Sequence, residues 1–148
     1  MKPETIALHA GYSGDPATHA ATTPIYQTTS YTFDDTQHGA DLFNLAVPGN
    51  IYSRIMNPTN AVLEQRLTEL EGGVGALALA SGMAAIRYAI EAIAEVGSNI
   101  VSTTQLYGGT YNLFAHTFPR QGIEVRFAKA DDFNKAASLI DKNTKALF

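Results

Sequence analysis

The amino-acid sequence predicts an α/β fold, with a mostly parallel sheet and helices on its faces. From residue 74 onward, short apolar runs alternate with segments of helical periodicity. The links between these segments are short, and several contain glycine. Such alternation is typical of strand–helix–strand units, whose strands lie parallel because each helix carries the chain back across the sheet.

The start of the chain differs from the rest. Residues 1–34 are rich in Thr, Ser, Tyr and Pro and show only weak periodicity. We therefore expect an extended arm with little core of its own, which would lie on another surface such as that of a neighbouring subunit. A short helix is expected from Thr36 to Ala46, because Asp34 or Asp35 can cap its start and Pro48-Gly49 can end it.

A second helix is expected immediately after Asn57. This residue is a good N-terminal cap, and Pro58 suits the first helical position. The apolar residues that follow form one stripe at helical spacing, namely Val62, Leu63, Leu67 and Leu70. The pair Gly72-Gly73 supplies a C-terminal stop.

The remaining segments alternate along the chain. Strands are expected at Val74–Leu79, Asn99–Thr103, Ile123–Phe127 and from Ala146 onward. Helices are expected at Gly82–Val96, Tyr107–Phe118 and Asp132–Ile140. The first of these helices has an apolar side formed by Met83, Ile86, Ile90 and Ile93. In parallel sheets ligands bind beyond the carboxyl ends of the strands, which directs attention to the loops after Leu79 and Thr103.

Composition excludes several classes of protein. Of the 148 residues, 45% are hydrophobic and 16% are charged, as in a globular protein. The net charge is -4 and the basic residues are scattered, which disfavours nucleic acid as a partner. No apolar run approaches the ~20 residues of a membrane span. No secretory leader is visible, so a cytoplasmic location is the default expectation.

Metal and thiol chemistry are not expected. The chain has no cysteine, which excludes a disulfide framework, a thiolate zinc site and a cysteine nucleophile within these residues. The histidines lack the spacing of metal ligands, and we expect no metal at any of them: His9, His19, His38 and His116.

Three segments carry candidate chemistry, and the first is Ala80–Ala85. Free backbone amides at a helix start, together with the helix dipole, form an anion site. Gly82 would let a phosphate approach the backbone, because it has no side chain. The segment also fits a strand-to-helix turn that uses glycine for geometry alone. The G-x-G-x-x-G and G-x-x-x-x-G-K-[ST] fingerprints are absent, which disfavours a dinucleotide or a nucleoside triphosphate.

The second segment contains Tyr52 and Arg54. In an extended segment, residues two apart point to the same side. A phenol and a guanidinium on one side can clamp a phosphate or carboxylate. The alternative is a packed tyrosine and a solvated arginine in a loop.

The third segment is Leu106–Thr110, directly after an expected strand. Tyr107 would lie at the ligand edge of the sheet, and the two glycines after it leave room for a flat ring. The alternative is a helix-entry turn with a half-buried tyrosine.

Together, these segments resemble the Cys/Met-metabolism enzymes that depend on pyridoxal 5'-phosphate (PLP). The sequences Y-S-R-I-M-N-P-T-N, A-S-G-M-A-A and Y-G-G-T occur in the order and spacing of that family. The stretches L-H-A-G-Y, P-I-Y-Q-T-T-S-Y-x-F and Q-L-Y-G-G-T-Y-N are most similar to O-acetylhomoserine sulfhydrylases. The resemblance implies the PLP-dependent transferase fold type I, which is aspartate-aminotransferase-like. Residues 1–57 would be an N-terminal arm and intersubunit segment, and residues 58–148 the first part of the large cofactor domain.

The resemblance also implies roles for individual residues. In the family, backbone amides of the S-G-M turn hold the PLP phosphate, the Y-x-R pair reaches that phosphate from a neighbouring subunit, and the tyrosine of Y-G-G-T stacks on the pyridine ring. The implied cofactor-binding residues are Tyr52, Arg54, Ser81, Gly82, Met83 and Tyr107. Tyr107 and Tyr52 are the candidate catalytic side chains, and Tyr107 could move a proton at the leaving group.

The implied activity belongs to methionine biosynthesis. It makes homocysteine from O-acetylhomoserine and sulfide, or another thiol, in a homotetramer built from dimers that share active sites. Alternatives within the family are methionine γ-lyase and cystathionine γ-synthase or β-lyase. An alternative from another class is a non-catalytic fragment that acts in assembly.

Three elements that the resemblance implies are missing from these residues: the lysine that bonds to the cofactor, the aspartate that pairs with the pyridine nitrogen, and the arginine that holds the substrate carboxylate. In the family the lysine lies in an S-x-T-K motif, which these residues do not contain. Lys145 follows Thr144, but it lacks the preceding serine and begins an apolar strand. We therefore expect the chain to be about the first third of a larger enzyme and to be inactive alone.

Overall fold

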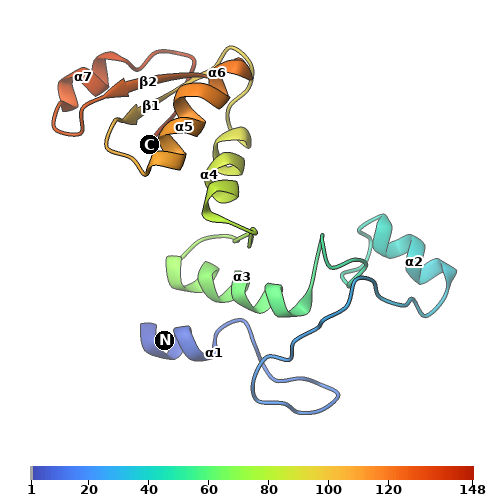
Figure 1. Cartoon of the computed structure of the whole chain (residues 1–148). Coiled ribbons are helices and arrows are strands. Elements are labelled where there is room, and N and C mark those ends of the chain that lie inside the picture. Colours follow the sequence, from blue (N-terminus) through green and yellow to red (C-terminus); the bar gives the residue numbers. More distant parts are fainter. Residues whose placement is uncertain (1) are drawn as a thin grey trace. The chain divides into compact units, whose positions relative to one another are not determined.

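The chain divides into two compact units, one up to Ala78 and one from Leu79 to Phe148. The computed structural model describes residues 2–148, apart from the side chain of Phe133. The described part of the first unit contains the helices α1 (Pro3–His9), α2 (Thr36–Phe43) and α3 (Pro58–Glu71). The second contains the sheet. Figure 1 shows both units and their elements.

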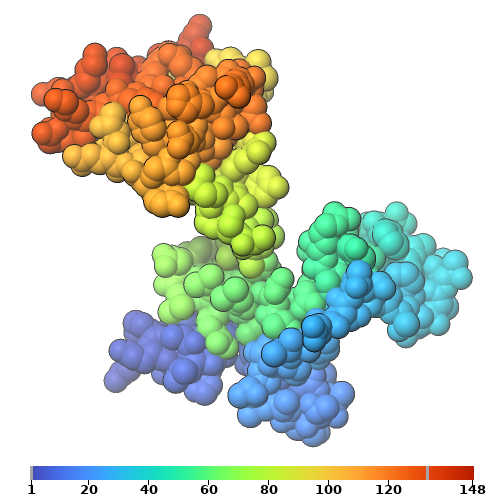
Figure 2. All heavy atoms as spheres, viewed as in Figure 1, coloured from blue at the N-terminus to red at the C-terminus, as the bar shows by residue number. Residues whose placement is uncertain are grey.

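Helix α1 lies alongside α3, and their atoms touch in the space-filling view (Figures 1 and 2). The side chain of Arg66 donates a hydrogen bond of 2.9 Å from Nε to the carbonyl oxygen of Ala10. Gly11 follows with a φ of 74°, and a Cβ there would lie 2.7 Å from the carbonyl oxygen of Val62. The prediction of an extended arm is therefore wrong for residues 3–9, which form a helix docked on α3.

The helices α2 and α3 begin where the sequence predicts. The side chain of Asp35 accepts a hydrogen bond from the backbone of His38, and α2 ends at Phe43 rather than Ala46. The side chain of Asn57 caps α3 in the same way. Gly72 ends α3 with a φ of 64°, in the left-handed region that glycine adopts without strain. The predicted apolar stripe on α3 is not buried in the unit, since Leu63, Leu67 and Leu70 are 39–50% exposed.

The prediction of a buried strand at Val74–Leu79 is wrong for this structure. The segment belongs to no strand, and Val74 and Leu77 are among the most exposed apolar residues. A strand requires a neighbour that takes up its backbone hydrogen bonds. Among the described residues, only the N–H of Ala78 in this segment finds a partner, the Glu64 carboxylate at 2.8 Å.

The second unit is built on a parallel sheet, as predicted. Its strands β1 (Asn99–Thr103), β2 (Glu124–Ala128) and β3 (Thr144–Leu147) lie in the order β2-β1-β3. Both pairings of β1 are parallel. The helical segments are α4 (Gly82–Glu91), α5 (Gly108–Asn112), the π-helical turn η1 (Leu113–Thr117), α6 (Phe118–Arg120) and α7 (Phe133–Ser138).

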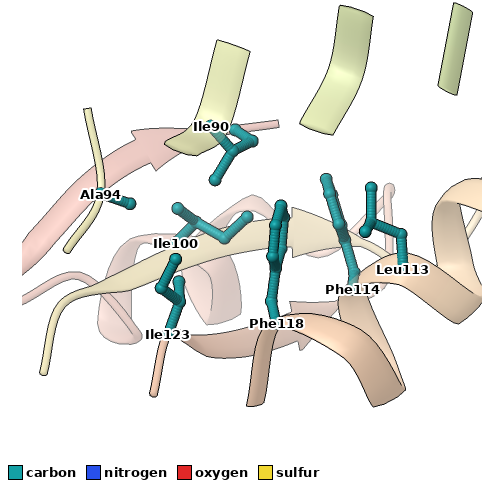
Figure 3. Close-up of a cluster of buried hydrophobic side chains, with 7 residues drawn as sticks. All are labelled: Ile90, Ala94, Ile100, Leu113, Phe114, Phe118 and Ile123. Atoms are coloured by element: carbon teal, nitrogen blue, oxygen red, sulfur yellow. The ribbon is translucent and has the colours of Figure 1, made fainter. Parts of the chain in front are cut away.

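The core of this unit lies between β1 and the helices α4 to α6 (Figure 3). Ile100 points into it from the sheet, and Ile90 enters from α4. The rings of Phe114 and Phe118 stack with 5.5 Å between their centroids, and both are fully buried. The predicted helix from Tyr107 to Phe118 is therefore present, but a π turn interrupts it and places two aromatic rings side by side.

Candidate functional site

The turn before α4 presents free backbone donors. The hydroxyl of Ser81 accepts a hydrogen bond of 3.2 Å from the N–H of Ala84. The backbone carbonyl of Ser81 accepts one of 3.0 Å from the N–H of Ala85. Within the described part of the chain, no acceptor faces the N–H of Gly82 or Met83. These two donors lie at the positive end of the helix dipole, where an anion is stabilised.

The space over this turn is open. A Cβ placed on Gly82 would meet no atom within 4 Å. The glycine is thus not required by packing inside the chain, which removes the simplest structural reason for it. A bare Cα in open space beside two free amides is what close approach of a phosphate needs.

Tyr107 lies at the carboxyl edge of the sheet, as the strand-end rule predicts. It follows β1 by a short loop that begins at Thr104, whose N–H bonds to Ala128 at the end of β2. Tyr107 is the residue before α5, and its carbonyl accepts a 3.0 Å hydrogen bond from Tyr111. The side chain is 76% exposed, so the ring is available to a ligand.

The structure brings Tyr107 and Met83 together. Both side chains lie beside Gly109, where a Cβ would lie 2.8 Å from Tyr107 Cε1 and 3.1 Å from Met83 Sδ. Thr110, only 2% exposed, contacts the same sulfur through its hydroxyl at 3.8 Å. The tyrosine ring and the start of α4 therefore belong to one continuous surface.

The other candidate pair, Tyr52 and Arg54, lies in the first unit. The guanidinium carbon of Arg54 lies 5.4 Å from the centre of the Tyr52 ring. Tyr52 forms an isolated antiparallel bridge with Ser30. A turn begins directly after it, because the N–H groups of Ile55 and Met56 both bond to the carbonyl of Tyr52. The prediction that both side chains lie on one side is confirmed, because the cation lies over the ring. The predicted extended geometry holds at Tyr52 but is wrong at Arg54, which lies in the turn.

This turn is anchored to the N-terminal arm. Asn57 donates 2.9 Å hydrogen bonds from its side-chain amide to the carbonyl of Tyr26 and to the hydroxyl of Ser53. The hydroxyl of Thr59 accepts from the N–H of Tyr26 at 2.9 Å and donates to the carbonyl of Pro24 at 2.8 Å. The motif residues Asn57 and Thr59 therefore fix the arm against the start of α3.

A mostly apolar groove of about 410 Å³ lies beside Tyr52 and Arg54. Its other walls are Ser30, Tyr31, Phe33, Phe43, Ile51 and Ile55. The hydroxyl of Tyr31 is buried and has no hydrogen-bond partner among the described residues. The charge in this lining comes from Arg54, which is exposed.

A second anchor in the arm is Asp15, which is 8% exposed. The hydroxyl of Tyr26 donates to its carboxylate at 2.8 Å, and the backbone of Thr18 donates at 2.7 Å. These hydrogen bonds lower the pKa of Asp15, the one from Tyr26 most strongly. The same contact raises the pKa of the Tyr26 phenol. The sequence analysis missed this cluster, although D-P-A-T is a typical signal for an aspartate that closes its own turn.

The candidate residues thus form two groups. One unit holds Ser81, Gly82, Met83 and Tyr107, and the other holds Tyr52 and Arg54. Lys145, which the sequence analysis set aside, lies on β3 with its Nζ 4.0 Å from a carboxylate oxygen of Glu95. In the described residues, no cluster of three or more His, Asp or Glu side chains is placed to hold a metal ion. No described helix is long and apolar enough to cross a membrane.

Comparison with known proteins agrees with these features. Residues 4–148 match the family model described as Cys/Met metabolism PLP-dependent enzyme. The chain is 53% identical over 145 residues to a homocysteine synthase of Schizosaccharomyces pombe. It is 52% identical over 148 residues to an O-acetyl-L-homoserine sulfhydrylase of Leptospira meyeri. These alignments cover 98% and 100% of this chain but 34% of each relative, so the chain spans about a third of their length.

Solved structures agree as well. The fold is similar to that of an O-acetylhomoserine (thiol)-lyase from Campylobacter jejuni, with a TM-score of 0.93 and 44% identity. That match covers 100% of this chain and 36% of the other, whose structure contains N'-pyridoxyl-lysine-5'-monophosphate. The fold is also similar to metB from Corynebacterium glutamicum, with a TM-score of 0.88, 31% identity, and coverage of 99% of this chain and 36% of the other. The prediction of an α/β fold of the PLP-dependent type is therefore confirmed.

Proposed function

Because the chain belongs to the Cys/Met metabolism PLP-dependent enzyme family, we propose that it serves an enzyme that makes homocysteine from O-acetylhomoserine and sulfide. The observation that carries the proposal is the surface around Gly82. Two free amides begin α4, and a Cβ on Gly82 beside them would meet no atom within 4 Å. The exposed ring of Tyr107 lies after β1, at the carboxyl edge of the parallel sheet, and it shares the surroundings of Gly109 with Met83. A flat ring that bears a phosphate is the ligand that such a surface suits.

The turn at the start of α4 would hold the phosphate. The N–H groups of Gly82 and Met83 would donate to its oxygens, and Ser81 orients the turn by capping the helix with its hydroxyl. The exposed ring of Tyr107 would stack on the pyridine ring. The cofactor would thus be gripped at its phosphate and over its face.

Tyr52 and Arg54 would reach the same phosphate from a neighbouring subunit. Arg54 supplies a permanent positive charge with several donors, which suits a phosphate, and the Tyr52 ring under its guanidinium restricts its movement. This arrangement requires dimers that share active sites, and we expect them to assemble into a cytoplasmic homotetramer.

When bound, PLP draws electrons away from the substrate carbons next to the amine, which allows the acetate group to leave and sulfide to take its place. The protein's part is to orient the ring and to move protons. Tyr107 would shift a proton near the carbon that carries the leaving group, as general acid or base. Tyr52 would assist from the phosphate side. The backbone amides at Gly82 need no protonation change, so they would hold the phosphate throughout the reaction.

A hybrid enzyme tests the proposal. Residues 1–148 would replace the matching part of the Leptospira meyeri relative, which is 52% identical over this length. We expect the hybrid to bind PLP and to release homocysteine from O-acetylhomoserine and sulfide. Tyr107→Phe should lower kcat by about 10²- to 10⁴-fold with little change in PLP affinity, because the ring remains while the hydroxyl is lost.

Two results would reject the proposal. One is a folded hybrid that binds no PLP. The other is a hybrid that binds PLP and releases methanethiol from methionine instead of forming homocysteine, which would favour a methionine γ-lyase. The unmodified Leptospira meyeri protein is the matched control for both measurements.

The chain by itself offers a further check. In this proposal, none of the lysines of residues 1–148 bonds to the cofactor. Lys145 is on β3, and its amine lies beside the carboxylate of Glu95. Treatment of the chain with PLP and borohydride should therefore leave no stoichiometric adduct at a single lysine. Such an adduct would show that the cofactor bonds within these residues.

A further inference from the structure

Gly109 occupies a narrow space between two candidate site residues. Its Cβ position lies 2.8 Å from Tyr107 Cε1, 3.1 Å from Met83 Sδ and 3.3 Å from Tyr107 Cδ1. The sulfur and the ring therefore lie within about 6 Å of each other, in the range where methionine–aromatic contacts are favourable. Any side chain on residue 109 would have to displace one of them.

The two neighbours differ in their freedom to move. The Met83 sulfur contacts the hydroxyl of Thr110, which is buried at 2% exposure, and Met83 itself packs against the core of the unit. The Tyr107 ring is 76% exposed. A Cβ at Gly109 would therefore move the tyrosine ring rather than the methionine.

From this geometry we infer that Gly109 is a positioning residue for Tyr107. Its missing side chain lets the aromatic ring lie beside the Met83 sulfur, at the turn that begins α4. The inference rests on the proposed function, because it supplies the reason why that ring has to face the phosphate-binding turn.

The preceding glycine provides a matched control. Gly108 also lies in α5, and a Cβ there would meet no atom within 4 Å. Neither glycine has the positive φ that would strain an alanine. Gly108→Ala and Gly109→Ala therefore make the same chemical change in adjacent positions, and only the second disturbs the ring.

A purely structural role predicts a different outcome from a positioning role. Alanine favours a helix more than glycine does, and an exposed ring yields at little cost. Gly109→Ala should therefore keep or slightly raise the melting temperature while it displaces Tyr107. A glycine needed for folding would instead give a lower melting temperature.

The first experiment uses the 148-residue chain without cofactor. Its three methionines give resolvable methyl signals when they are labelled with ¹³C. We expect Gly109→Ala to shift the Met83 methyl signal toward its position in Tyr107→Leu, where no ring is present. Gly108→Ala should leave the signal unchanged. An unchanged signal in Gly109→Ala would overturn the inference.

The second experiment measures PLP affinity in the hybrid enzyme. Loss of a ring contact weakens binding by about threefold to tenfold. Gly109→Ala should show a loss of that size. In a Tyr107→Ala background Gly109→Ala should have no further effect, because its action passes through the ring.

The outcomes distinguish a failure of the proposed function from a failure of the positioning role of Gly109. A hybrid with the native sequence that binds no PLP rejects the proposed function, whereas the methyl signals still decide whether Gly109 places the ring. A hybrid that binds PLP equally well with alanine at position 109 rejects the role of Gly109 alone. If Gly109→Ala weakens PLP binding equally in the native hybrid and in the Tyr107→Ala hybrid, the positioning role of Gly109 is also rejected.

Discussion

The guanidinium of Arg126 on β2 donates a 2.7 Å hydrogen bond to the carboxylate of Asp141, in the turn before β3. Asn99, fully buried on β1, donates to the other oxygen of the same carboxylate at 2.9 Å. The turn before β3 is thus joined to β1 and β2 by one polar network. The hydrogen bond from Arg126, followed by that from Asn99, holds the pKa of Asp141 well below its usual range.

This network predicts how the second unit responds to acid. A carboxyl whose pKa is lower in the folded state contributes stability at pH values above its unfolded pKa of about 3.9, and that contribution is lost as the pH falls further. In Asp141→Asn the contribution is absent at all pH values. Urea unfolding from pH 7 to pH 3 should therefore show a steeper loss of stability for the native chain below pH ~4 than for the variant.

The matched control is Asp131→Asn, which alters an exposed carboxylate in the loop before α7. It should follow the pH profile of the native chain. If Asp141→Asn also loses stability in parallel with the native chain down to pH 3, the network does not contribute.

Asn57 gives a second prediction, because one side chain performs two tasks. Its oxygen caps α3 through the N–H of Thr59 at 2.9 Å, and its amide donates to Tyr26 and Ser53. Asn57→Asp retains the cap but loses the donors, whereas Asn57→Ala loses both. We expect alanine to cost about 1–2 kcal/mol in the free energy of unfolding, and aspartate to cost less.

Limited proteolysis separates the two tasks further. Both variants should be cut faster than the native chain around Tyr26, because both lose the hydrogen bond from the Asn57 amide to the Tyr26 carbonyl and leave Thr59 to hold the arm. Equal protection of the arm in Asn57→Asp and the native chain would mean that the amide bonds do not hold it.

Gly11 gives a third prediction, with Gly72 as its control. Both residues have a positive φ, at 74° and 64°, so alanine is strained at either position. Only at Gly11 would the Cβ also collide with another backbone, 2.7 Å from the carbonyl oxygen of Val62. At Gly72 it would meet no atom within 4 Å.

Gly72→Ala should therefore cost about 1–2 kcal/mol from backbone strain alone. Gly11→Ala should cost more and should also detach α1 from α3, because a carbonyl in a helix cannot move aside. Faster hydrogen exchange in residues 3–9 of Gly11→Ala, and not of Gly72→Ala, would be the signature. Equal effects of the two substitutions would show that the close approach is not required.

Local sequence predicts the starts of helices in this fold better than it predicts contacts between distant segments. The starts of α2 and α3 follow from Asp35 and Asn57, because a cap acts within three residues of its own position. Helix α1 was not predicted, although Pro3 at its start, Glu4 in its first turn and His9 in its last turn are local helix signals. Its docking on α3 involves a close approach between Gly11 and Val62, which no local pattern reveals. The strand predicted at Val74–Leu79 failed for the same reason: apolar composition favours a strand, but pairing decides whether one forms.

In the candidate site, too, some features could be predicted from the sequence and others depend on packing. The position of Tyr107 followed from the rule that ligands bind at the carboxyl ends of parallel strands. The free amides at Gly82 followed from its place at the start of a helix. The contact of Met83 with Gly109 and Thr110 could not be predicted, because it joins two helices whose packing depends on the whole core.

A fourth prediction concerns Gly82 itself. Since its Cβ would meet no protein atom, Gly82→Ala should leave the melting temperature unchanged or higher. In the hybrid enzyme the added methyl group would occupy the space of the phosphate and break charge-assisted hydrogen bonds to the turn. PLP affinity should then fall by about tenfold to a hundredfold. Loss of thermal stability without loss of affinity would assign Gly82 a structural role instead.

The last prediction concerns Arg54, where charge and shape can be separated. Arg54→Ala in the hybrid should weaken PLP binding by about tenfold to a hundredfold, because a charge-assisted hydrogen bond contributes about 1.5–3 kcal/mol. Arg54→Lys keeps the charge but loses the planar fork that stacks on Tyr52 at 5.4 Å. It should therefore recover only part of the affinity. Fluorescence titration with PLP measures both variants, and affinity equal to that of the native hybrid in Arg54→Ala would remove this arginine from the site.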